Sequence, residues 1–242
     1  MSTPMTTRGW STTELTLALR ATVRGDVVTA EDPSFAAAAF GVDTTPGRAP
    51  EVVVVAADAQ DVAAVARLAP AIGRRVRTLA SATVGRHAAG PLAVPPGTIL
   101  VVTRLLTRVN VDSTRREVTA GVGAGWREVV RALAPLGLQV AVDADRPAGT
   151  AVVPDPTRSG IVGVEVVTAE GSLRRLRSGE GPTDDRDRFA ALIAGATCFG
   201  VVTAITLRLA PLAPAAPVRP FVDARPRNGR ALELCAAEPT RA

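Results

Sequence analysis

Lysine and tyrosine are both absent from this chain of 242 residues, and histidine occurs once, as His87. The two cysteines, Cys198 and Cys235, lie far apart and have no His or Cys at the spacing of a metal site. Neither a disulfide framework nor a zinc site is therefore indicated, and we expect no bound metal. Because tyrosine is lacking, no phenol can serve as a catalytic acid or base.

Long uncharged hydrophobic runs are also lacking. Arg, Asp or Pro interrupts every apolar stretch before it reaches the roughly 18 residues that a membrane span needs. The N-terminus is mostly polar and does not combine a basic start with an apolar run, as a secretory leader would. Since 47% of the residues are hydrophobic, a packed core is expected. We expect a folded, cytoplasmic protein without a membrane partner.

All basic charge is carried by arginine, with 28 basic against 23 acidic residues and a net charge of +5. Arginines cluster at 74–77, 115–116 and 174–177, but acidic residues are interspersed and aromatic residues make up only 3%. Nucleic-acid surfaces usually combine basic patches with aromatic stacking. The pattern is more typical of a solvated surface, so we expect no nucleic-acid partner.

The first half of the chain changes from a helical to an extended period near residue 51. Residues 1–24 predict a short helix with Thr12 or Thr13 as N-cap and with apolar contacts at Leu15, Leu17 and Leu19. The run EVVVVA at 51–56 predicts a strand, and a helix follows from Asp58 with Val62, Val65 and Leu68 at helical spacing. Residues 75–79 are short and extended. This strand–helix–strand unit favours a parallel pair of strands.

The middle of the chain predicts strands at 98–103, 108–111 and 116–122, arranged as a meander. A second helix is expected from Trp126 to a C-cap at Gly137, with Val129, Val130, Leu133 and Leu136 on one face.

The remaining pattern predicts a hairpin of 161–168 and 172–177, an acidic loop at 178–187, a short helix at 189–194 and a strand at 201–209. Crossover and hairpin connections together indicate an α+β fold in two layers, with mixed sheets and packed helices. We expect a lead-in segment at 1–46, one domain at 47–211 and, at 212–242, a tail or the remnant of another domain.

Four stretches carry further information through their order and spacing. They are EVVVVAADAQDVAAVARLAPAIGRRV at 51–76, VNVDSTRREVTAGVGAGWREVVRALAPLGL at 109–138, VGVEVVTAEGSLRRL at 162–176 and DRFAALIAGATCFGVVTAITLRLAP at 187–211. In this order they resemble the FAD-binding domain of the p-cresol methylhydroxylase and vanillyl-alcohol oxidase superfamily, especially its berberine-bridge-enzyme-like branch. The resemblance implies FAD as cofactor and an oxidoreductase ancestry.

The resemblance also implies which residues contact the flavin. A pyrophosphate needs backbone N–H donors presented by a tight loop of small residues. By resemblance the first flavin loop consists of Arg77, Thr78, Leu79, Ala80, Ser81, Ala82 and Thr83. Ile161 and Val164 fall where the backbone of the family meets the adenine end, and Val201 falls near the closing contact.

Three departures from the family pattern limit what is carried over. Thr83 stands where many members have the histidine that bonds covalently to the flavin, and His87 lies four residues later, so noncovalent FAD is expected. Between Leu138 and Val164 a Gly-rich insert is shortened, which leaves Gly160 among the few glycines that can replace it. The substrate domain that follows in the family is expected to be lacking.

Two functions stay open. One is the flavin-dependent oxidation of a small organic substrate, for which no catalytic residue can be named. The other is a non-catalytic, degenerate flavin-domain fragment that binds FAD weakly or not at all, because a fold does not determine a function. Cys198 is read as a buried filler rather than a nucleophile, and the acids at 184–187 as solvated rather than metal-binding.

Overall fold

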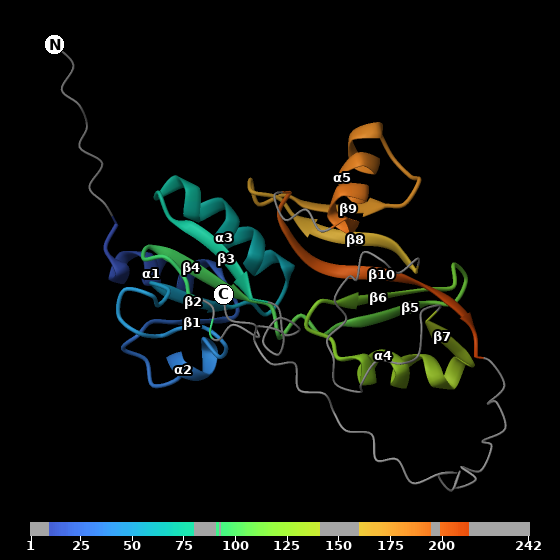
Figure 1. Cartoon of the computed structure of the whole chain (residues 1–242), viewed down its shortest axis with the longest axis horizontal. Helices are drawn as coiled ribbons and strands as arrows, with labels where there is room; N and C mark the ends of the chain where they lie inside the picture. The colour runs from blue at the N-terminus through green and yellow to red at the C-terminus, as the bar shows by residue number, and fades with distance from the viewer. Residues whose placement is uncertain (1–9, 80–90, 92, 141–159, 195–198, 213–242) are drawn as a thin grey trace, which may run out of the picture. The chain divides into compact units, whose positions relative to one another are not determined.

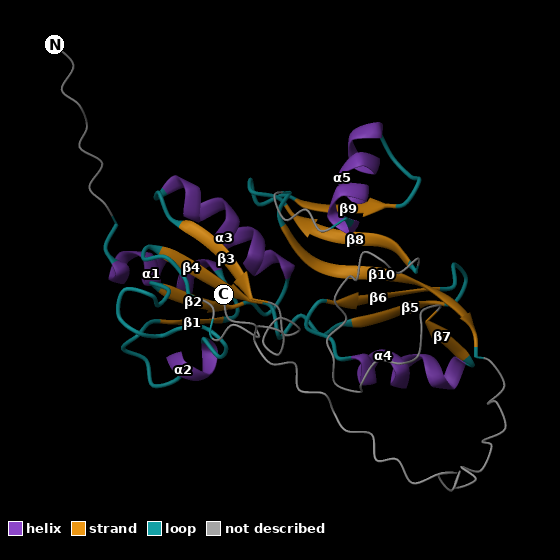
Figure 2. Cartoon of the chain, in the orientation of Figure 1, coloured by secondary structure: helices purple, strands orange, loops and turns teal. Residues whose placement is uncertain are grey.

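The computed structural model describes residues 10–79, 91, 93–140, 160–194 and 199–212. The chain divides into a compact unit, Met1–Pro211, and a second unit, Leu212–Ala242. All helices and strands below belong to the first unit and are labelled in Figure 1. Figure 2 shows the same view with helices and strands distinguished by colour.

The first sheet has four strands in the order β1-β2-β4-β3. Its strands are β1 (Asp26–Val28), β2 (Val52–Val55), β4 (Thr98–Val102) and β3 (Arg75–Leu79). β4 pairs in parallel with β2 on one side and β3 on the other, whereas β1 pairs antiparallel with β2. Helices α1 (Thr12–Thr22), α2 (Phe35–Ala38) and α3 (Ala59–Ala71) complete this part of the chain.

Both faces of the first sheet are buried. Val52 and Val54 pack with α1 and α3, whereas Val53 and Val55 pack with α2 on the opposite face. A strand covered on both faces needs a continuous apolar run rather than an alternating one. This explains why four valines follow one another in β2.

The second sheet is built around the long strand β10 (Val201–Pro211) in the order β5-β6-β10-β8-β9, with β7 also paired to β10. The other strands are β5 (Val109–Asp112), β6 (Glu117–Gly121), β7 (Leu138–Val140), β8 (Ile161–Val167) and β9 (Leu173–Arg177). Helices α4 (Trp126–Leu133) and α5 (Thr183–Ile193) pack on an apolar face that includes Val118, Val164 and Ile205. A 3₁₀ turn, Ala134–Leu136, follows α4.

The hydrophobic core is continuous from one sheet to the other. The cluster around α3 and the first sheet also contains Val122 and Val167, which belong to the second part of the chain. Arg67 of α3 donates a hydrogen bond of 2.9 Å to the carbonyl oxygen of Gly171, in the turn between β8 and β9. The two sheets are therefore parts of one packed unit.

The structure confirms the α+β class and most of the expected elements, including the hairpin of β8 and β9 and the left-handed C-cap at Gly137, whose φ is 61°. The N-cap prediction was wrong by one residue. Ser11 caps α1 and forms a capping box with Glu14, because its hydroxyl accepts from the Glu14 N–H while the Glu14 carboxylate accepts from the Ser11 N–H.

Four other predictions need correction. The meander is wrong because β4 lies in the first sheet, between β2 and β3, and only β5 and β6 form a hairpin. α5 begins at Thr183, so residues 183–187 are helical rather than loop. Strands β1 and β7 were not expected. Three leucine or valine side chains expected to face the core are exposed: Leu17, Val130 and Leu136.

Within the described part of the chain, none of the helices combines the length and apolar character needed to cross a membrane.

Candidate functional site

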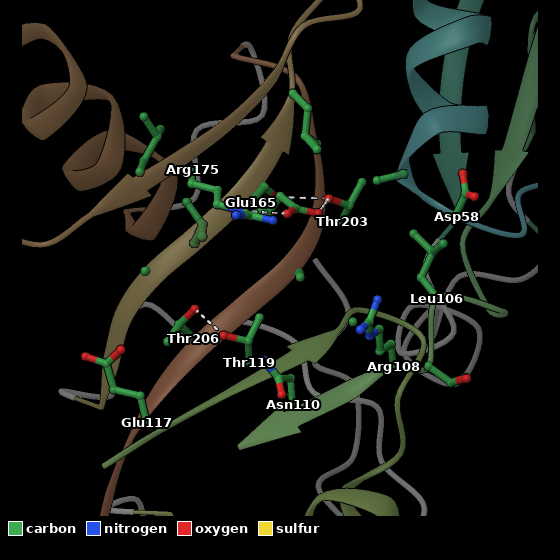
Figure 3. Close-up of a pocket in the computed structure, with 18 of the residues that line it drawn as sticks. Asp58, Leu106, Arg108, Asn110, Glu117, Thr119, Glu165, Arg175, Thr203 and Thr206 are labelled. Atoms are coloured by element: carbon green, nitrogen blue, oxygen red, sulfur yellow. Dashed lines mark hydrogen bonds and ion pairs between the residues drawn. The ribbon is translucent and has the colours of Figure 1, made fainter. Parts of the chain in front are cut away.

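A polar cleft of about 780 Å³ lies over the face of the second sheet that α4 and α5 leave uncovered. Residues of β5, β6, β8, β9 and β10 line it, together with Ala57–Gln60 at the start of α3 and the segment Leu105–Arg108. Figure 3 shows this cleft. Its volume is in the range of small-molecule and cofactor sites.

The floor of the cleft consists of small residues on the central strands. Gly121 of β6 pairs with Ala204 of β10, and Thr119 pairs with Thr206, which in turn pairs with Gly163 of β8. The Thr119 and Thr206 hydroxyl oxygens lie 3.0 Å apart and share a hydrogen bond, as Figure 3 shows. A hydroxyl can both donate and accept, so this pair keeps capacity to bind a ligand.

Glu165 lies on one side of the cleft and is held by two neighbours. Its carboxylate accepts a hydrogen bond of 3.0 Å from the buried Thr203 hydroxyl and one of 3.1 Å from Nε of Arg175. The Glu165 side chain is only 18% exposed, whereas the Arg175 side chain is 80% exposed. The carboxylate is thus oriented from below by Thr203 and paired at the rim by Arg175.

A second ion pair lies where β6 and β9 face the cleft. Arg177 donates to Glu117 at 2.6 Å, and its Nε is 3.2 Å from a carboxylate oxygen of Glu180. The hydrogen bond to Glu117 is the main cause that raises the pKa of Arg177 above its usual value. This guanidinium therefore stays protonated and engaged with carboxylates.

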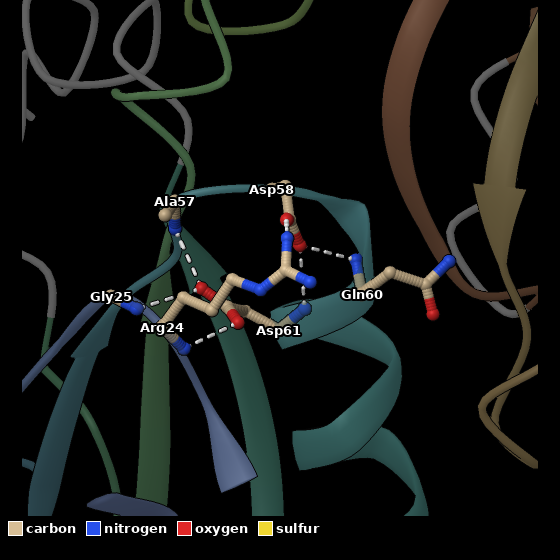
Figure 4. Close-up of polar contacts among 6 residues, drawn as sticks. All are labelled: Arg24, Gly25, Ala57, Asp58, Gln60 and Asp61. Carbon is tan, nitrogen blue, oxygen red and sulfur yellow. Dashed lines mark hydrogen bonds and ion pairs between the residues drawn. The ribbon is translucent and has the colours of Figure 1, made fainter.

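The start of α3 forms the opposite wall and is held by two aspartates (Figure 4). Asp58 caps the helix by accepting from the N–H groups of Gln60 and Asp61, and it pairs with Arg24 at 3.1 Å. Asp61 is 1% exposed, and its carboxylate accepts from the N–H groups of Arg24, Gly25 and Ala57 at 2.8, 3.0 and 2.8 Å. Both carboxylates serve the local backbone.

The glycines of the GVGAG run at 121–125 resemble a phosphate-binding loop in composition, but the structure gives them another role. A Cβ on Gly121 would lie 2.0 Å from the Leu106 carbonyl oxygen, and one on Gly123 would lie 2.5 Å from that of Arg104. These glycines allow the backbone that joins the two sheets to pass directly over β6.

The predicted flavin contacts lie in several places. Arg77 and Thr78 are exposed on edge strand β3, while Leu79 is buried in the first-sheet core. Ala80, Ser81, Ala82 and Thr83 lie outside the described residues, as do His87 and Cys198.

The other predicted contacts lie at the second sheet. Gly160 is buried and its carbonyl accepts from the Arg208 N–H at 2.8 Å. Ile161 packs against the core beneath the sheet, and Val201 packs against the core around α3. Val164 lines the cleft and is the predicted contact that the structure brings to it among the described residues.

The polar residues of the cleft were not expected from the sequence, namely Arg108, Thr119, Glu165, Thr203 and Thr206. A signal for them does exist in β6, where Glu117, Thr119 and Gly121 alternate with buried Val118 and Ala120. Such alternation indicates a strand with one face away from the core. It does not tell which other strands contribute to the same surface.

Comparison with known proteins decides the family. Residues 50–177 match the family model described as the FAD binding domain. The chain belongs to this family. The fold is that of the p-cresol methylhydroxylase-type FAD-binding domain, as the resemblance implied.

Two curated relatives match parts of this FAD-binding domain. An alditol oxidase of a Streptomyces species is 32% identical over 129 residues, which are 48% of this chain and 30% of the relative. A FAD-dependent monooxygenase of Arthrobotrys oligospora is 31% identical over 168 residues, which are 66% of this chain and 32% of the relative. The chain thus matches about a third of the length of each. They support a flavin oxidoreductase family.

Two solved structures share the fold. The 6-hydroxy-D-nicotine oxidase of Arthrobacter nicotinovorans superposes with a TM-score of 0.59 at 24% identity, over 78% of this chain and 43% of that one. A berberine bridge enzyme variant superposes with a TM-score of 0.63 at 16% identity, over 83% of this chain and 44% of that one. Both confirm the expected fold, including its likeness to the berberine-bridge branch.

The donor set of the cleft fits a cofactor with sugar and phosphate parts. Thr119, Thr206 and Asn110 offer hydroxyl and amide groups, Arg108 offers a guanidinium, and the glycines of the floor let a flat group approach the sheet. When bound, FAD supplies hydride and electron transfer. These residues would hold and orient it.

No carboxylate of the cleft is left without a partner among the described residues. Asp58, Glu117 and Glu165 are paired as above, and Asp112 accepts from the Arg115 N–H at 2.9 Å. A general base for substrate oxidation is therefore not evident in the cleft. In the same described part of the chain, no three His, Cys, Asp or Glu side chains gather as metal ligands would.

Proposed function

We propose that this FAD-binding domain binds FAD noncovalently in the cleft over the second sheet. The observation that carries the proposal is the family match over residues 50–177, which includes β5, β6, β8 and β9, four of the five strands that line the cleft. The polar, small-residue floor supports it, because a dinucleotide needs hydrogen-bonding partners and close backbone approach. Noncovalent binding is proposed because Thr83 stands at the position of the family's flavin-linked histidine.

The reaction we propose is flavin-dependent oxidation of a small organic substrate. Alditols are the first compounds to test, since one relative is an alditol oxidase that is 32% identical over its matched region. The base that would take the substrate proton is not among the carboxylates of the cleft, because each of them already accepts hydrogen bonds or forms an ion pair.

A visible spectrum of the purified chain tests cofactor binding directly. We expect a yellow protein with a flavin spectrum, or a colourless one that gains this spectrum when FAD is added and excess FAD is removed. Acid precipitation should release the pigment into the supernatant. A pigment that stays with the precipitate would contradict noncovalent binding, and a colourless protein that takes up no FAD would contradict the proposal as a whole.

A second candidate is a non-catalytic flavin-domain fragment. It is favoured by the engaged carboxylates of the cleft and by the absence of tyrosine from the sequence. Anaerobic mixing of the FAD-loaded protein with an alditol separates the two candidates. Bleaching of the yellow flavin favours the oxidase, whereas a bound flavin that is reduced only by a chemical reductant favours the non-catalytic alternative.

A further inference from the structure

The charged side chains of the cleft are not all neutralised by one another. On the β9 side, Arg175 pairs with Glu165 and Arg177 pairs with Glu117. On the opposite side, Arg108 stands at the entry to β5 and has no carboxylate within ion-pair distance among the described residues. Arg108 therefore presents an uncompensated cation to the cleft.

Arg108 and Glu165 lie in one row across the sheet. The Arg108 carbonyl accepts from the Gly121 N–H at 2.9 Å, Gly121 pairs with Ala204, and Ala204 pairs with Glu165. All four residues line the cleft. Three inter-strand spacings separate the backbones of Arg108 and Glu165, a distance of about 14 Å.

The residues between these two charges are a glycine and an alanine, so nothing bulky rises from the floor of this row. Long side chains reaching inward from Arg108 and Glu165 narrow the gap to the size of a small polar group. Figure 3 shows Arg108 on the β5 side and Glu165 beside Thr203 on the other. The row thus offers a cation and an anion across an open platform.

Glu165 keeps acceptor capacity after its two hydrogen bonds. A carboxylate has about four lone-pair sites, and the bonds from Thr203 and Arg175 use two of them. A carboxylate held in this way is suited to accept from the two hydroxyls of a ribose, as acidic residues do in other dinucleotide sites. A guanidinium is suited to a phosphate because its donors match two phosphate oxygens.

We propose that this row recognises the ribose phosphate of an adenine nucleotide, with Arg108 binding the phosphate and Glu165 accepting from the ribose hydroxyls. The inference rests on the proposed function in one respect, since the ligand would be the adenosine diphosphate half of FAD. It goes further by assigning this half, rather than the flavin ring, to the row between β5 and β8.

Calorimetric titration of the full chain, freed of bound flavin, tests the role of Arg108. Arg108→Gln should weaken ADP and FAD binding by about ten- to a hundredfold, the loss expected for a hydrogen bond to a charged group. It should leave adenosine binding unchanged, because adenosine has no phosphate. Arg131→Gln is the matched control, since Arg131 is exposed on α4, which packs on the opposite face of the sheet.

The role of Glu165 is tested with ADP and its 2′,3′-dideoxy analogue. The wild type should bind ADP more tightly than the analogue, and Glu165→Gln should reduce this preference. Equal losses on both ligands would instead indicate a structural role through Arg175, and would overturn the assignment of Glu165.

The outcomes separate this inference from the proposed function. If Arg108→Gln and Arg131→Gln bind ADP equally well while the wild type binds FAD, the inference is wrong and FAD binding stands. If the wild type binds ADP but not FAD, the proposed function is wrong and the row is a nucleotide site in its own right. If it binds neither, both are wrong.

Discussion

Asp61 is the charged side chain that is buried almost completely among the described residues, at 1% exposure. Its carboxylate joins three segments, because it accepts from N–H groups at the start of β1, after β2 and, as part of α3, from its own helix approach. Buried N–H groups need partners, since leaving one unpaired costs about 1–3 kcal/mol. Asp61 thus connects the β1 turn to α3 beside the cleft wall.

Replacing this carboxylate should be costly. Asp61→Ala leaves the N–H groups of Arg24, Gly25 and Ala57 without their acceptor, so we expect the free energy of unfolding to fall by about 3 kcal/mol or more. Asp58→Ala is the control, because it removes an N-cap at the helix surface and should cost about 1 kcal/mol. Denaturant titration measures both, and equal losses would contradict the role given to Asp61.

The two aspartates also show what a sequence reveals at this scale. Asp58 precedes a helical pattern, so its capping role follows from position alone. Asp61 looks like an ordinary acid in the first turn of a helix, which the helix dipole favours. Its partners, Arg24 and Gly25, lie more than thirty positions earlier, and only the fold brings them to the carboxylate.

Among the elements, β6 carries the closest backbone contact of the second sheet. The segment Thr103–Thr107 joins the two sheets and passes over Gly121, whose N–H lies on β6 opposite Arg108. Any side chain at position 121 would collide with the Leu106 carbonyl, and backbone yields less readily than a side chain. The position therefore requires glycine for steric reasons.

Gly121→Ala should lower the free energy of unfolding by roughly 1–3 kcal/mol, as overpacking does in tightly packed interiors. Gly125→Ala makes the same chemical change in the same run of glycines. A Cβ at Gly125 would meet only the flexible carboxylate of Glu128, which can move away, so little loss is expected. Thermal unfolding of the two variants decides the point, and a similar loss in both would refute the steric explanation.

Element identity was largely predictable, and element placement was not. The valine run of β2 and the alternation in β10 gave the right periods because burial on two faces or on one leaves different patterns. β4 follows the same rules but pairs between β2 and β3, a choice made by tertiary packing rather than by local sequence. β7 is only three residues long and has no readable period.

The whole described unit shares one core, since Val167 of β8 packs among α3 and first-sheet residues. Val167→Ala leaves a cavity in that shared core and should cost about 2 kcal/mol. Hydrogen exchange should then report the same loss of protection for β2 and β4 as for β8 and β10. Leu17→Ala, at an exposed position on α1, is the control and should change neither.

A loss confined to β8 and β10 would mean that the two sheets open independently. In that case the Arg67–Gly171 hydrogen bond and the shared cluster would not couple them.

The cleft could not have been predicted as a whole. Its lining comes from five strands, a helix start and a connecting segment that are spread between residues 57 and 206. The family resemblance placed Val164 there, but Arg108 and Glu165 become neighbours only through the pairing of β5, β6, β10 and β8. Strand order, which the sequence does not display, creates the surface.

The central position of β10 has a consequence for synthesis on the ribosome. Every strand of the first sheet has been translated by residue 102, whereas β10, which pairs with β6, β7 and β8, begins only at residue 201. Until it emerges, the nascent hairpins β5–β6 and β8–β9 each carry one unpaired edge, and such edges readily pair with other chains. The second sheet is thus completed by its last-made strand, and any polypeptide released before that point keeps both edges open.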